Sequence, residues 1–493
     1  MKVKQYAAML LTAAALCSAW AVPCGAETTT SATTTTTAET TVTTTRPVIE
    51  ALQYEITDGE AVITAFSWLN ETVVTIPDTI EGCPVTKIAP YAFQYCFADE
   101  VILPKTVREI GDYSFMGCEY LLNLTIPEDC VYIGYSAFQD CTQLKTVVIP
   151  ETVSEIGFCA FEDTAFIRSI TDDCIILGDG VLYAYQGGAD VKDVVIPDTV
   201  KTIGYYAFAD QQSIESITIP DSVTQIMEGA FDNCVSLGTI HAPATFARLE
   251  PDALYNTKWF REYKGDFVTL GNILVAYKGE GPEVTVPDSV AIIGRSAFEG
   301  NPFITTVHLP ASVTEIRKAA FYKCSSLQVV TTSDSVSRID DMAFYGCKTL
   351  KFINIGSKLE HLGGRAFLSC DALESLNLPV TVQSVGEYAL GYVLDVQTDA
   401  LLKQEGFTVY SNAEAVKNYG KSAAVAVEPY SDEVTQTTPE VTTSTTTTLS
   451  TARNAGSPTA SKGWVIPVIV GAVLIVGGLV TICIRMRKKQ VKS

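Results

Sequence analysis

Cysteine is the residue whose type and spacing in this chain could support chemistry. Zinc-binding cysteines usually lie about two to four residues apart, whereas neighbours in the main set here are mostly 22 or 23 residues apart, so no metal site is predicted. The pattern favours buried free thiols that meet a backbone group at a turn, and disulfides between stacked copies stay open as an alternative. Seven of the 14 cysteines follow a phenylalanine by three residues: Cys96, Cys118, Cys141, Cys234, Cys324, Cys347 and Cys370.

Other patterns that would support catalysis or bind a cofactor are missing from the sequence. The three histidines, His241, His308 and His361, are scattered, and no nucleophile elbow, phosphate-binding glycine loop or calcium loop occurs. A glycosidase needs two carboxylates about 5–10 Å apart beside a cleft, and among 56 acidic residues nothing singles out such a pair. We therefore expect no catalytic residue, no cofactor and no metal, and a protein that is not an enzyme.

The element that must position these residues is a repeat of about 23 residues. The pattern I-P-x-x-V-x-x-I-G-x-x-A-F-x-x-C-x-x-L-x-x-V-x-I-P recurs twelve times between Ile88 and Leu390. A fixed period of this size indicates units that bury their apolar faces by stacking on one another, which is a solenoid. The second residue of the A-F pair, called the marker residue below, is Phe93, Phe115, Phe138, Phe161, Phe208, Phe231, Leu254, Phe298, Phe321, Phe344, Phe367 and Leu390.

Within one copy the pattern predicts three short elements. Apolar residues alternate in 144–149 and Pro150 follows, which predicts a strand that ends at the proline. Residues 153–157 predict a second short extended run with a glycine turn, and 137–141 fit a single helical turn. Stacking would place equivalent strands about 4.8 Å apart in a parallel sheet.

Two marker intervals are almost twice the usual length, and both contain the same insert. Residues 175–187 and 268–279 each carry a glycine turn between apolar, aromatic-rich runs, which predicts hairpins that bulge from one edge of the solenoid. The ends are predicted to be capped. Residues 54–66 form a hairpin that pairs with the first repeat, and 407–427 form a strand and a short helix.

The repeat resembles the BspA-like (treponemal-type) leucine-rich repeat. The pattern is almost letter for letter at 126–150 and 196–220, and the YxITDGxAxIT opening and YSN closure also match that family over roughly 53–427. The resemblance implies a leucine-rich repeat solenoid, β-rich, with a parallel sheet and short helical turns. It also implies a bacterial surface protein that adheres to host or partner-cell proteins. The poorest matches are 249–254 and 329–333.

Composition predicts how the rest of the chain is arranged. An apolar, basic-led start predicts a secretory signal, cleaved after Ala21 or Ala26. An uncharged run of 21 residues followed by a basic tail predicts one transmembrane helix, oriented with the tail inside. The predicted segments are 1–26 signal peptide, 27–47 Thr-rich linker, 48–428 solenoid with caps, 429–463 Thr/Ser/Pro stalk, 464–484 C-terminal transmembrane helix and 485–493 basic cytoplasmic tail.

Charge narrows the possible partners. The net charge is −22, and all 56 acidic residues lie within 27–463, whereas seven of the 34 basic residues lie outside it. Phosphate backbones would be repelled, so nucleic acid is not an expected partner. We expect a single-pass protein of the cell membrane with its N-terminal ectodomain outside and its short basic tail inside, which binds an extracellular or cell-surface protein, glycoproteins included.

The outward residues of the predicted strands form the candidate ligand face. They carry few charges, although threonine is also simply a good strand residue. A broad, uncharged, hydroxyl-rich surface suits many modest contacts with a macromolecule, with a protein favoured, on a concave face. The alternatives are a structural spacer without a ligand and a carbohydrate-binding surface protein. The candidate residues are Thr75, Thr125, Thr146, Thr218, His241, Thr285, His308, Phe352, Asn354 and Asn377.

Overall fold

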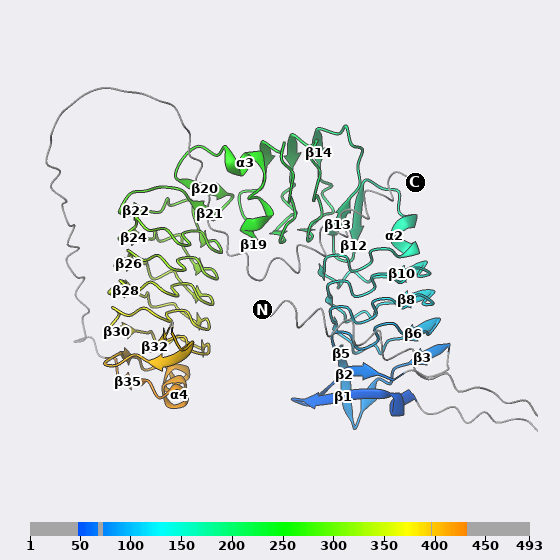
Figure 1. Cartoon of the computed structure of the whole chain (residues 1–493), viewed down its shortest axis with the longest axis horizontal. Helices are drawn as coiled ribbons and strands as arrows, with labels where there is room; N and C mark the ends of the chain where they lie inside the picture. The colour runs from blue at the N-terminus through cyan, green and yellow to red at the C-terminus, as the bar shows by residue number, and fades with distance from the viewer. Residues whose placement is uncertain (1–47, 68–71, 396, 431–493) are drawn as a thin grey trace, which may run out of the picture. The chain divides into compact units, whose positions relative to one another are not determined.

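The computed structural model describes residues 48–67, 72–395 and 397–430, which form a coil of short strands (Figure 1). Each regular turn contributes one three-residue strand and one two-residue strand, and these pair with their equivalents in the next turn to form separate parallel sheets. The sheets of two-residue strands are interrupted twice. We therefore describe three successive stacks: stack 1 (48–170), stack 2 (174–262) and stack 3 (267–428).

Stack 1 begins with a hairpin whose second strand joins the first turn in parallel, with Ile63 opposite Ile88. The predicted N-terminal cap is thereby confirmed. Its elements are η1 (Val48–Ala51), β1 (Leu52–Thr57) and β2 (Glu60–Phe66); three-residue strands β3 (Val73–Thr75), β6 (Glu100–Ile102), β8 (Asn123–Thr125) and β10 (Thr146–Val148); β4 (Thr79–Ile80), β5 (Cys83–Ile88), β7 (Glu109–Ile110), β9 (Tyr132–Ile133) and β11 (Glu155–Ile156); and α2 (Ala165–Ser169).

Stack 2 has the same plan and is shorter. Its elements are the hairpin β12 (Cys174–Leu177) and β13 (Val181–Tyr185); three-residue strands β14 (Asp193–Val195), β16 (Ser216–Thr218) and β18 (Thr239–His241); two-residue strands β15 (Thr202–Ile203), β17 (Gln225–Ile226) and β19 (Arg248–Leu249); and η2 (Pro251–Ala253) and α3 (Lys258–Arg261).

Stack 3 repeats the plan and ends in a cap. Its elements are the hairpin β20 (Phe267–Leu270) and β21 (Ile273–Tyr277); three-residue strands β22 (Glu283–Thr285), β24 (Thr306–His308), β26 (Val329–Thr331), β28 (Phe352–Asn354), β30 (Ser375–Asn377), β34 (Thr408–Tyr410) and β35 (Ala426–Glu428); two-residue strands β23 (Ile292–Ile293), β25 (Glu315–Ile316), β27 (Arg338–Ile339), β29 (His361–Leu362) and β31 (Ser384–Val385); and the hairpin β32 (Tyr392–Asp395) and β33 (Ala400–Lys403) with α4 (Glu414–Ala423).

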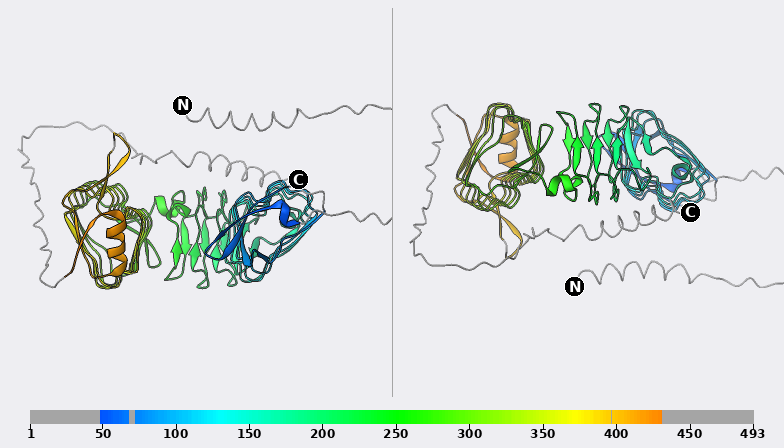
Figure 2. Two further views of the ribbon diagram at one scale, coloured as in Figure 1. Left: turned by 90° about the horizontal axis from the view of Figure 1, so that it is seen from below. Right: turned by 90° about the horizontal axis from the view of Figure 1, so that it is seen from above.

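The core of each stack is a ladder of marker phenylalanines. In stack 3 the rings of Phe298 and Phe321 are nearly parallel with centroids 4.7 Å apart, and Phe321 and Phe344 follow at 5.0 Å. All of the marker phenylalanines are buried. Burial of each such side chain contributes about 1.5–3 kcal/mol, and the ring spacing matches the strand spacing, so one period positions both. Figure 2 shows that successive turns of stacks 1 and 3 superpose in outline.

The A-F-x-x-C segment is not the single helical turn that the sequence predicts. In the third turn Ser136 and Asp140 have left-handed φ values of 50° and 61°, which a right-handed helix excludes. Backbone N–H groups of alternate residues instead bond to the next turn, as Phe138 N does to Ala160 O at 2.7 Å. The segment is a wide turn that adds a further column of hydrogen bonds between copies.

The two inserted hairpins do not bulge from an edge, so that prediction is wrong. All five residues of β13 are buried, and β13 pairs in parallel with β15, just as β21 pairs with β23. Each hairpin therefore starts a new sheet, and its aromatic end takes the place of a marker residue. The ring of Tyr185 lies 4.9 Å from that of Phe208 and Tyr277 lies 5.1 Å from Phe298, as Phe66 lies 5.0 Å from Phe93 in stack 1.

The C-terminal cap contains the predicted strand and helix, β34 and α4, and one further strand, β35, that the sequence analysis did not predict. Val416 and Tyr419 of α4 are buried against the last turn of stack 3. The Tyr419 hydroxyl donates to Leu390 O at 2.8 Å and accepts from Leu390 N at 3.0 Å, so the final wide turn keeps hydrogen-bond partners although no further copy follows.

Several predicted segments lie outside the described residues. They are the signal peptide 1–26, the linker 27–47, nearly all of the stalk 429–463, the transmembrane helix 464–484 and the tail 485–493. Within the described part of the chain, no helix has both the length and the apolar character that crossing a bilayer requires.

Candidate binding face

All ten candidate residues lie on three-residue strands, at the first or the third position. Side chains alternate along a strand, and the middle residues, such as Val74 and Leu124, are buried in the core. The first and third side chains therefore point outward. Thr75, Thr125 and Thr146 are exposed, as in the outward pattern of their strands. The predicted strands and their outward direction are confirmed, whereas the binding role stays a prediction.

Parallel pairing arranges third-position residues in short ladders rather than one continuous column. In stack 2 Thr218 lies opposite His241, and in stack 3 Thr285, His308 and Asn354 belong to one ladder, with Thr331 between the last two. Neighbouring members of a ladder are about 4.8 Å apart. The ladders stop at the two stack junctions, because α2 and α3 stand where the repeat would place the next strand.

His308 is the best-connected residue of this face. Its Nδ1 lies 2.8 Å from Thr331 Oγ1, and its Nε2 lies 3.3 Å from Glu283 Oε1. Glu283 belongs to the first-position column, which also contains Glu100 and Asp193, all three exposed. The two candidate residues in that column, Thr146 and Phe352, are uncharged. The face therefore has an uncharged third-position column beside a first-position column with several carboxylates.

Phe352 does not serve as the exposed aromatic residue that the sequence analysis expected. It is only 9% exposed, and Thr306 and Val329 at the first positions of neighbouring strands are also buried. Val329 lies in register opposite Phe352 and opposite Thr306 on its other side, so neighbours about 4.8 Å away shield one another. Phe352 is thus removed from the candidate face. Asn377 remains on β30, half-buried, opposite Tyr410.

The cysteine slot has a structural role. Cys141 Sγ donates to Phe115 O of the preceding turn at 3.1 Å, and Cys347 Sγ donates to Phe321 O at 3.0 Å. Gln211 makes the equivalent bond from Nε2, to Tyr185 O at 3.3 Å. The seven slot cysteines are free and buried, and burial raises the pKa of Cys234 to about 12. All but Cys96 donate to a carbonyl of the preceding turn and so join successive turns, in agreement with the buried free thiols that the spacing favoured.

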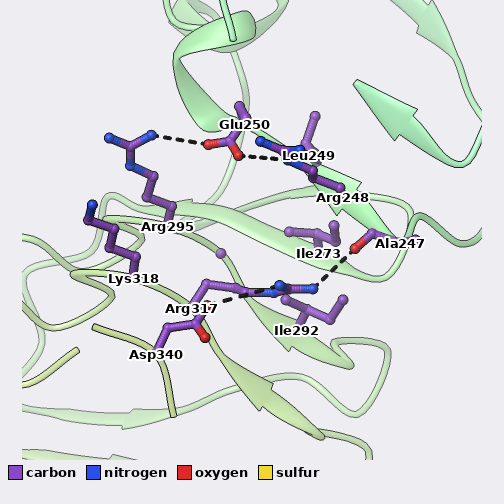
Figure 3. Close-up of a pocket in the computed structure, with 11 residues that line it drawn as sticks. Ala247, Arg248, Leu249, Glu250, Ile273, Ile292, Arg295, Arg317, Lys318 and Asp340 are labelled. Carbon is purple, nitrogen blue, oxygen red and sulfur yellow. Dashed lines mark hydrogen bonds and ion pairs between the residues drawn. The ribbon is translucent and has the colours of Figure 1, made fainter. Parts of the chain in front are cut away.

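A hollow that the sequence analysis missed lies on the side of the two-residue strands, at the junction of stacks 2 and 3 (Figure 3). It has a volume of about 140 Å³. Glu250 pairs with Arg248 at 3.1 Å and with Arg295 at 3.2 Å, and Arg317 Nη2 donates to Ala247 O at 3.1 Å. The sequence carried one sign that these turns are unusual. Glu250 and Arg317 stand where the repeat pattern V-x-x-I-G has glycine.

A contact between distant turns shows how the coil curves at this place. Arg248 Nη1 lies 3.4 Å from Glu155 Oε2, although 93 residues separate the two in the chain. Side chains on the same side of turns this far apart meet only where that side curves inward. At this place the inward side carries the two-residue strands, whereas the sequence analysis predicted a concave face on the three-residue strands.

One buried acid lies beside this hollow. Burial raises the pKa of Asp252 to about 6, and the carboxylates of Glu228 and Glu250 act in the same direction, while Arg295 opposes them. Its Oδ1 is buried and accepts no hydrogen bond from the described residues. In the part of the chain that the structure describes, no group of three or more His, Cys, Asp or Glu side chains could hold a metal ion.

The stacked turns, phenylalanine ladder and parallel strands define a leucine-rich repeat solenoid. The family model described as BspA type leucine rich repeat region (6 copies) matches residues 63–176, 182–264 and 276–395, which is more than half of the chain. The protein therefore belongs to this family, and the resemblance seen in the sequence is confirmed. The three matched ranges follow the three stacks.

Solved structures that are similar to this chain come from bacteria. A leucine rich cell surface protein from Faecalibacterium prausnitzii is 26% identical, with 70% of this chain and 92% of that chain covered and a TM-score of 0.26. A leucine-rich repeat protein from Bacteroides ovatus is 22% identical, with 78% and 99% covered and a TM-score of 0.25. The pneumococcal vaccine antigen PcpA is 14% identical, with 77% and 97% covered and a TM-score of 0.25. None of the curated proteins matches the chain.

Proposed function

We propose that this protein is a cell-surface binding protein that holds a host or partner-cell protein on the third-position column of its three-residue strands. The observation that carries the proposal is the composition of that column. From Thr75 to Asn377 it contains no Asp, Glu, Lys or Arg, although the whole chain carries a net charge of −22. Members of the column that are exposed or half-exposed include Thr218, His241 and Thr285.

The chemistry of the column suits a broad protein surface. Hydroxyl and imidazole groups donate and accept hydrogen bonds, while Ile102, Val148 and Val195 of the same column are exposed aliphatic side chains. Such a mixture of polar and apolar groups is typical of protein interfaces. The third-position column contains no Phe, Tyr or Trp between Thr75 and Asn377, and Phe352 of the neighbouring first-position column is buried, which favours a protein over a carbohydrate ligand.

Two further proposals concern the location of the protein in the cell and its lack of catalytic activity. We propose an ectodomain outside the cell, held by the 464–484 helix with its basic tail inside; this rests on the sequence signals described above. We also propose that the protein performs no catalysis and needs no cofactor. A surface spacer without a specific ligand is the competing function, and the same binding experiment separates the two.

The test uses the full chain in mild detergent against immobilised extracellular-matrix proteins, whole host cells and a glycan array. Thr218→Glu with His241→Glu places two charges on one ladder, because the residues are directly opposite each other. We expect saturable binding to a protein that weakens at least tenfold in this variant. Thr142→Glu, at an exposed position on a wide turn, is the matched control and should bind normally. Binding that the double variant retains would contradict the proposed face, and no binding to any probe would favour the spacer.

A further inference from the structure

Exposed aromatic side chains gather on the first two wide turns of stack 1. Tyr91, Tyr95 and Phe97 are 55%, 57% and 56% exposed, and Tyr120 in the next turn is 46% exposed. Among the described residues, only Phe303 and Tyr430 are comparably exposed aromatic residues elsewhere. Large exposed apolar groups that cluster in this way mark interaction sites more often than isolated ones do. We call Tyr91, Tyr95, Phe97, Tyr113 and Tyr120 the aromatic patch.

The patch is one ordered surface. The rings of Tyr91 and Tyr113 are parallel within 4°, with centroids 5.0 Å apart, and the rings of Phe97 and Tyr120 lie 5.9 Å apart. Tyr95 lies over Gly117, where an added Cβ would come within 2.5 Å of its ring carbons. The patch thus contains two aromatic pairs, each spanning two adjacent turns, and the single ring of Tyr95, which extends over Gly117 of the next turn.

Tyrosine recurs at the Tyr91 position, as in Tyr113, Tyr206 and Tyr388, but folding does not explain an aromatic residue at the Tyr95 position. Tyr91 and Tyr95 have left-handed φ values of 64° and 59°, a conformation that Gly, Asn and Asp adopt with less strain. Other copies use such residues at the Tyr95 position: Asp140, Asp163, Asp210, Asn233, Gly300 and Gly346. A bulky residue in a strained backbone conformation that also stays exposed gains little from burial, so its presence points to a role outside the core.

The charges around the patch define the partner. No Lys or Arg occurs in 88–104 or in 109–144, whereas Asp99, Glu100 and Glu119 lie between or beside the aromatic residues. An acidic surface with exposed tyrosines attracts cations twice, through the carboxylates and through the faces of the rings. Tyrosine and phenylalanine are also enriched in the cores of protein interfaces.

We infer that the aromatic patch docks a segment of a partner protein that carries lysine or arginine beside apolar side chains. The apolar side chains would pack on the rings, and the cation would lie between ring faces and Glu119. The patch lies on wide turns of stack 1 and not on the three-residue strands, so this inference does not depend on the proposed binding face. A neutral glycan, which could also stack on aromatic rings, is the competing ligand.

The experiment selects binders from a random peptide phage library on the immobilised full chain. We expect enrichment of peptides that combine Lys or Arg with apolar residues. The same peptides should bind the variant Tyr91→Asn with Tyr95→Asn at least about tenfold more weakly. Since asparagine tolerates the left-handed backbone, the thermal midpoint of this variant should be unchanged or higher. Ala319→Asn, which occupies the Tyr91 position of a turn in stack 3 at a φ of 58°, should bind normally.

A second variant tests the charge separately from the rings. Glu119→Lys leaves every aromatic residue in place and should weaken the selected basic peptides, while peptides with Glu in place of Lys or Arg should not bind wild type. The inference is overturned if enriched peptides lack basic residues, if the double asparagine variant binds them unchanged, or if its thermal midpoint falls, which would indicate a structural role. Patch-dependent binding to a neutral glycan array instead of peptides would overturn it equally.

Discussion

Regular turns and junction turns differ in one buried side chain. In a regular turn Cys141 donates to the carbonyl of Phe115, one turn back. In the junction turn Thr164, at the same slot, donates to Phe161 O of its own turn at 2.7 Å and accepts from Ile167 N at 3.1 Å, which caps α2. A donor directed to the preceding turn continues the coil, whereas one directed to its own turn starts a helix and ends the strand ladder.

The second junction follows the same rule. Thr257 donates to Leu254 O at 2.6 Å and accepts from Phe260 N at 3.2 Å, which caps α3. After each helix a hairpin begins the next sheet with an aromatic residue, Tyr185 or Tyr277, that restarts the ring ladder. The junctions are therefore built-in stop and restart elements. Charged side chains also gather at the second junction, around Glu250.

The largest expected effect comes from breaking the regular ladder. Phe321→Ala removes a fully buried ring between Phe298 and Phe344, and we expect a loss of about 3–5 kcal/mol in the free energy of unfolding. Urea denaturation with hydrogen exchange of stack 3 measures it. Phe303→Ala, in the same stack at a residue 37% exposed, should cost less than about 1 kcal/mol. Equal losses for both variants would contradict a core made by the ring ladder.

An intermediate effect is expected from removing a junction cap. Thr257→Val keeps the shape of the side chain but loses both hydrogen bonds, so we expect a loss of about 1–2 kcal/mol. Faster hydrogen exchange should be confined to residues 258–270. The control Thr314→Val changes an exposed threonine of a regular turn whose hydroxyl donates to Ala291 O at 3.3 Å. If Thr257→Val lost no more stability than Thr314→Val, the hydrogen bonds of the slot residue would not distinguish junction turns from regular turns.

A gain in stability, of similar or smaller size, is expected when Asp252 at the second junction is replaced. The pKa of Asp252 rises from 3.8 to about 6 on folding. Between these pH values the folded state binds the proton more tightly, so stability should increase as the pH falls from about 6 to about 4. Asp252→Asn should raise stability at pH 7 by about 1–2 kcal/mol and abolish that slope.

Thermal midpoints across pH 4–7 check this prediction. Asp221→Asn, at an exposed aspartate of stack 2, is the control and should retain the slope. If Asp252→Asn destabilised the protein at pH 7, the carboxylate would have to be a favourable partner of Arg295, and the junction would depend on that ion pair.

The smallest effect is expected when the native protein is treated with a reagent that alkylates thiols. At pH 8 the slot thiol of Cys234 is buried and protonated, because burial raises its pKa to about 12, so alkylation of the native protein should be slow. Cys83 and Cys174 are half-buried and lie outside the slot; they should react before Cys234. Mass spectrometry of tryptic peptides distinguishes them. Rapid labelling of Cys234 without unfolding would show that the regular turns open more readily than their packing indicates.

Much of the regular fold could be predicted from the sequence. Strand positions such as β10 and β11, the burial of the marker phenylalanines and both end caps follow from periodicity, because each apolar residue must reach the same core once per turn. The wide turn was mistaken for a helical turn, since Ala, Phe and Cys at such spacing fit either, and only the left-handed φ at Ser136 and Asp140 decides.

The candidate face was predictable in outline but not in detail. Alternation along a strand identifies which residues point outward, and nine of the ten candidates remain on the face. Phe352 was lost because its exposure depends on neighbours from other turns, which a single strand pattern does not contain. The hollow beside Arg248 and Arg317 was missed for a similar reason: the replaced repeat glycines mark unusual turns, but they do not show that residues 70 positions apart meet there.

By itself, the sequence of this protein determines the period, the direction of each strand residue and the composition of the core, because these depend on spacing along one chain. The tertiary structure alone decided which slot residues continue the coil and which end it. Cys141 and Thr164 are both small, buried donors, and the difference lies in whether the preceding turn or the same turn supplies the acceptor. That choice depends on three-dimensional distances, which spacing in the sequence does not specify.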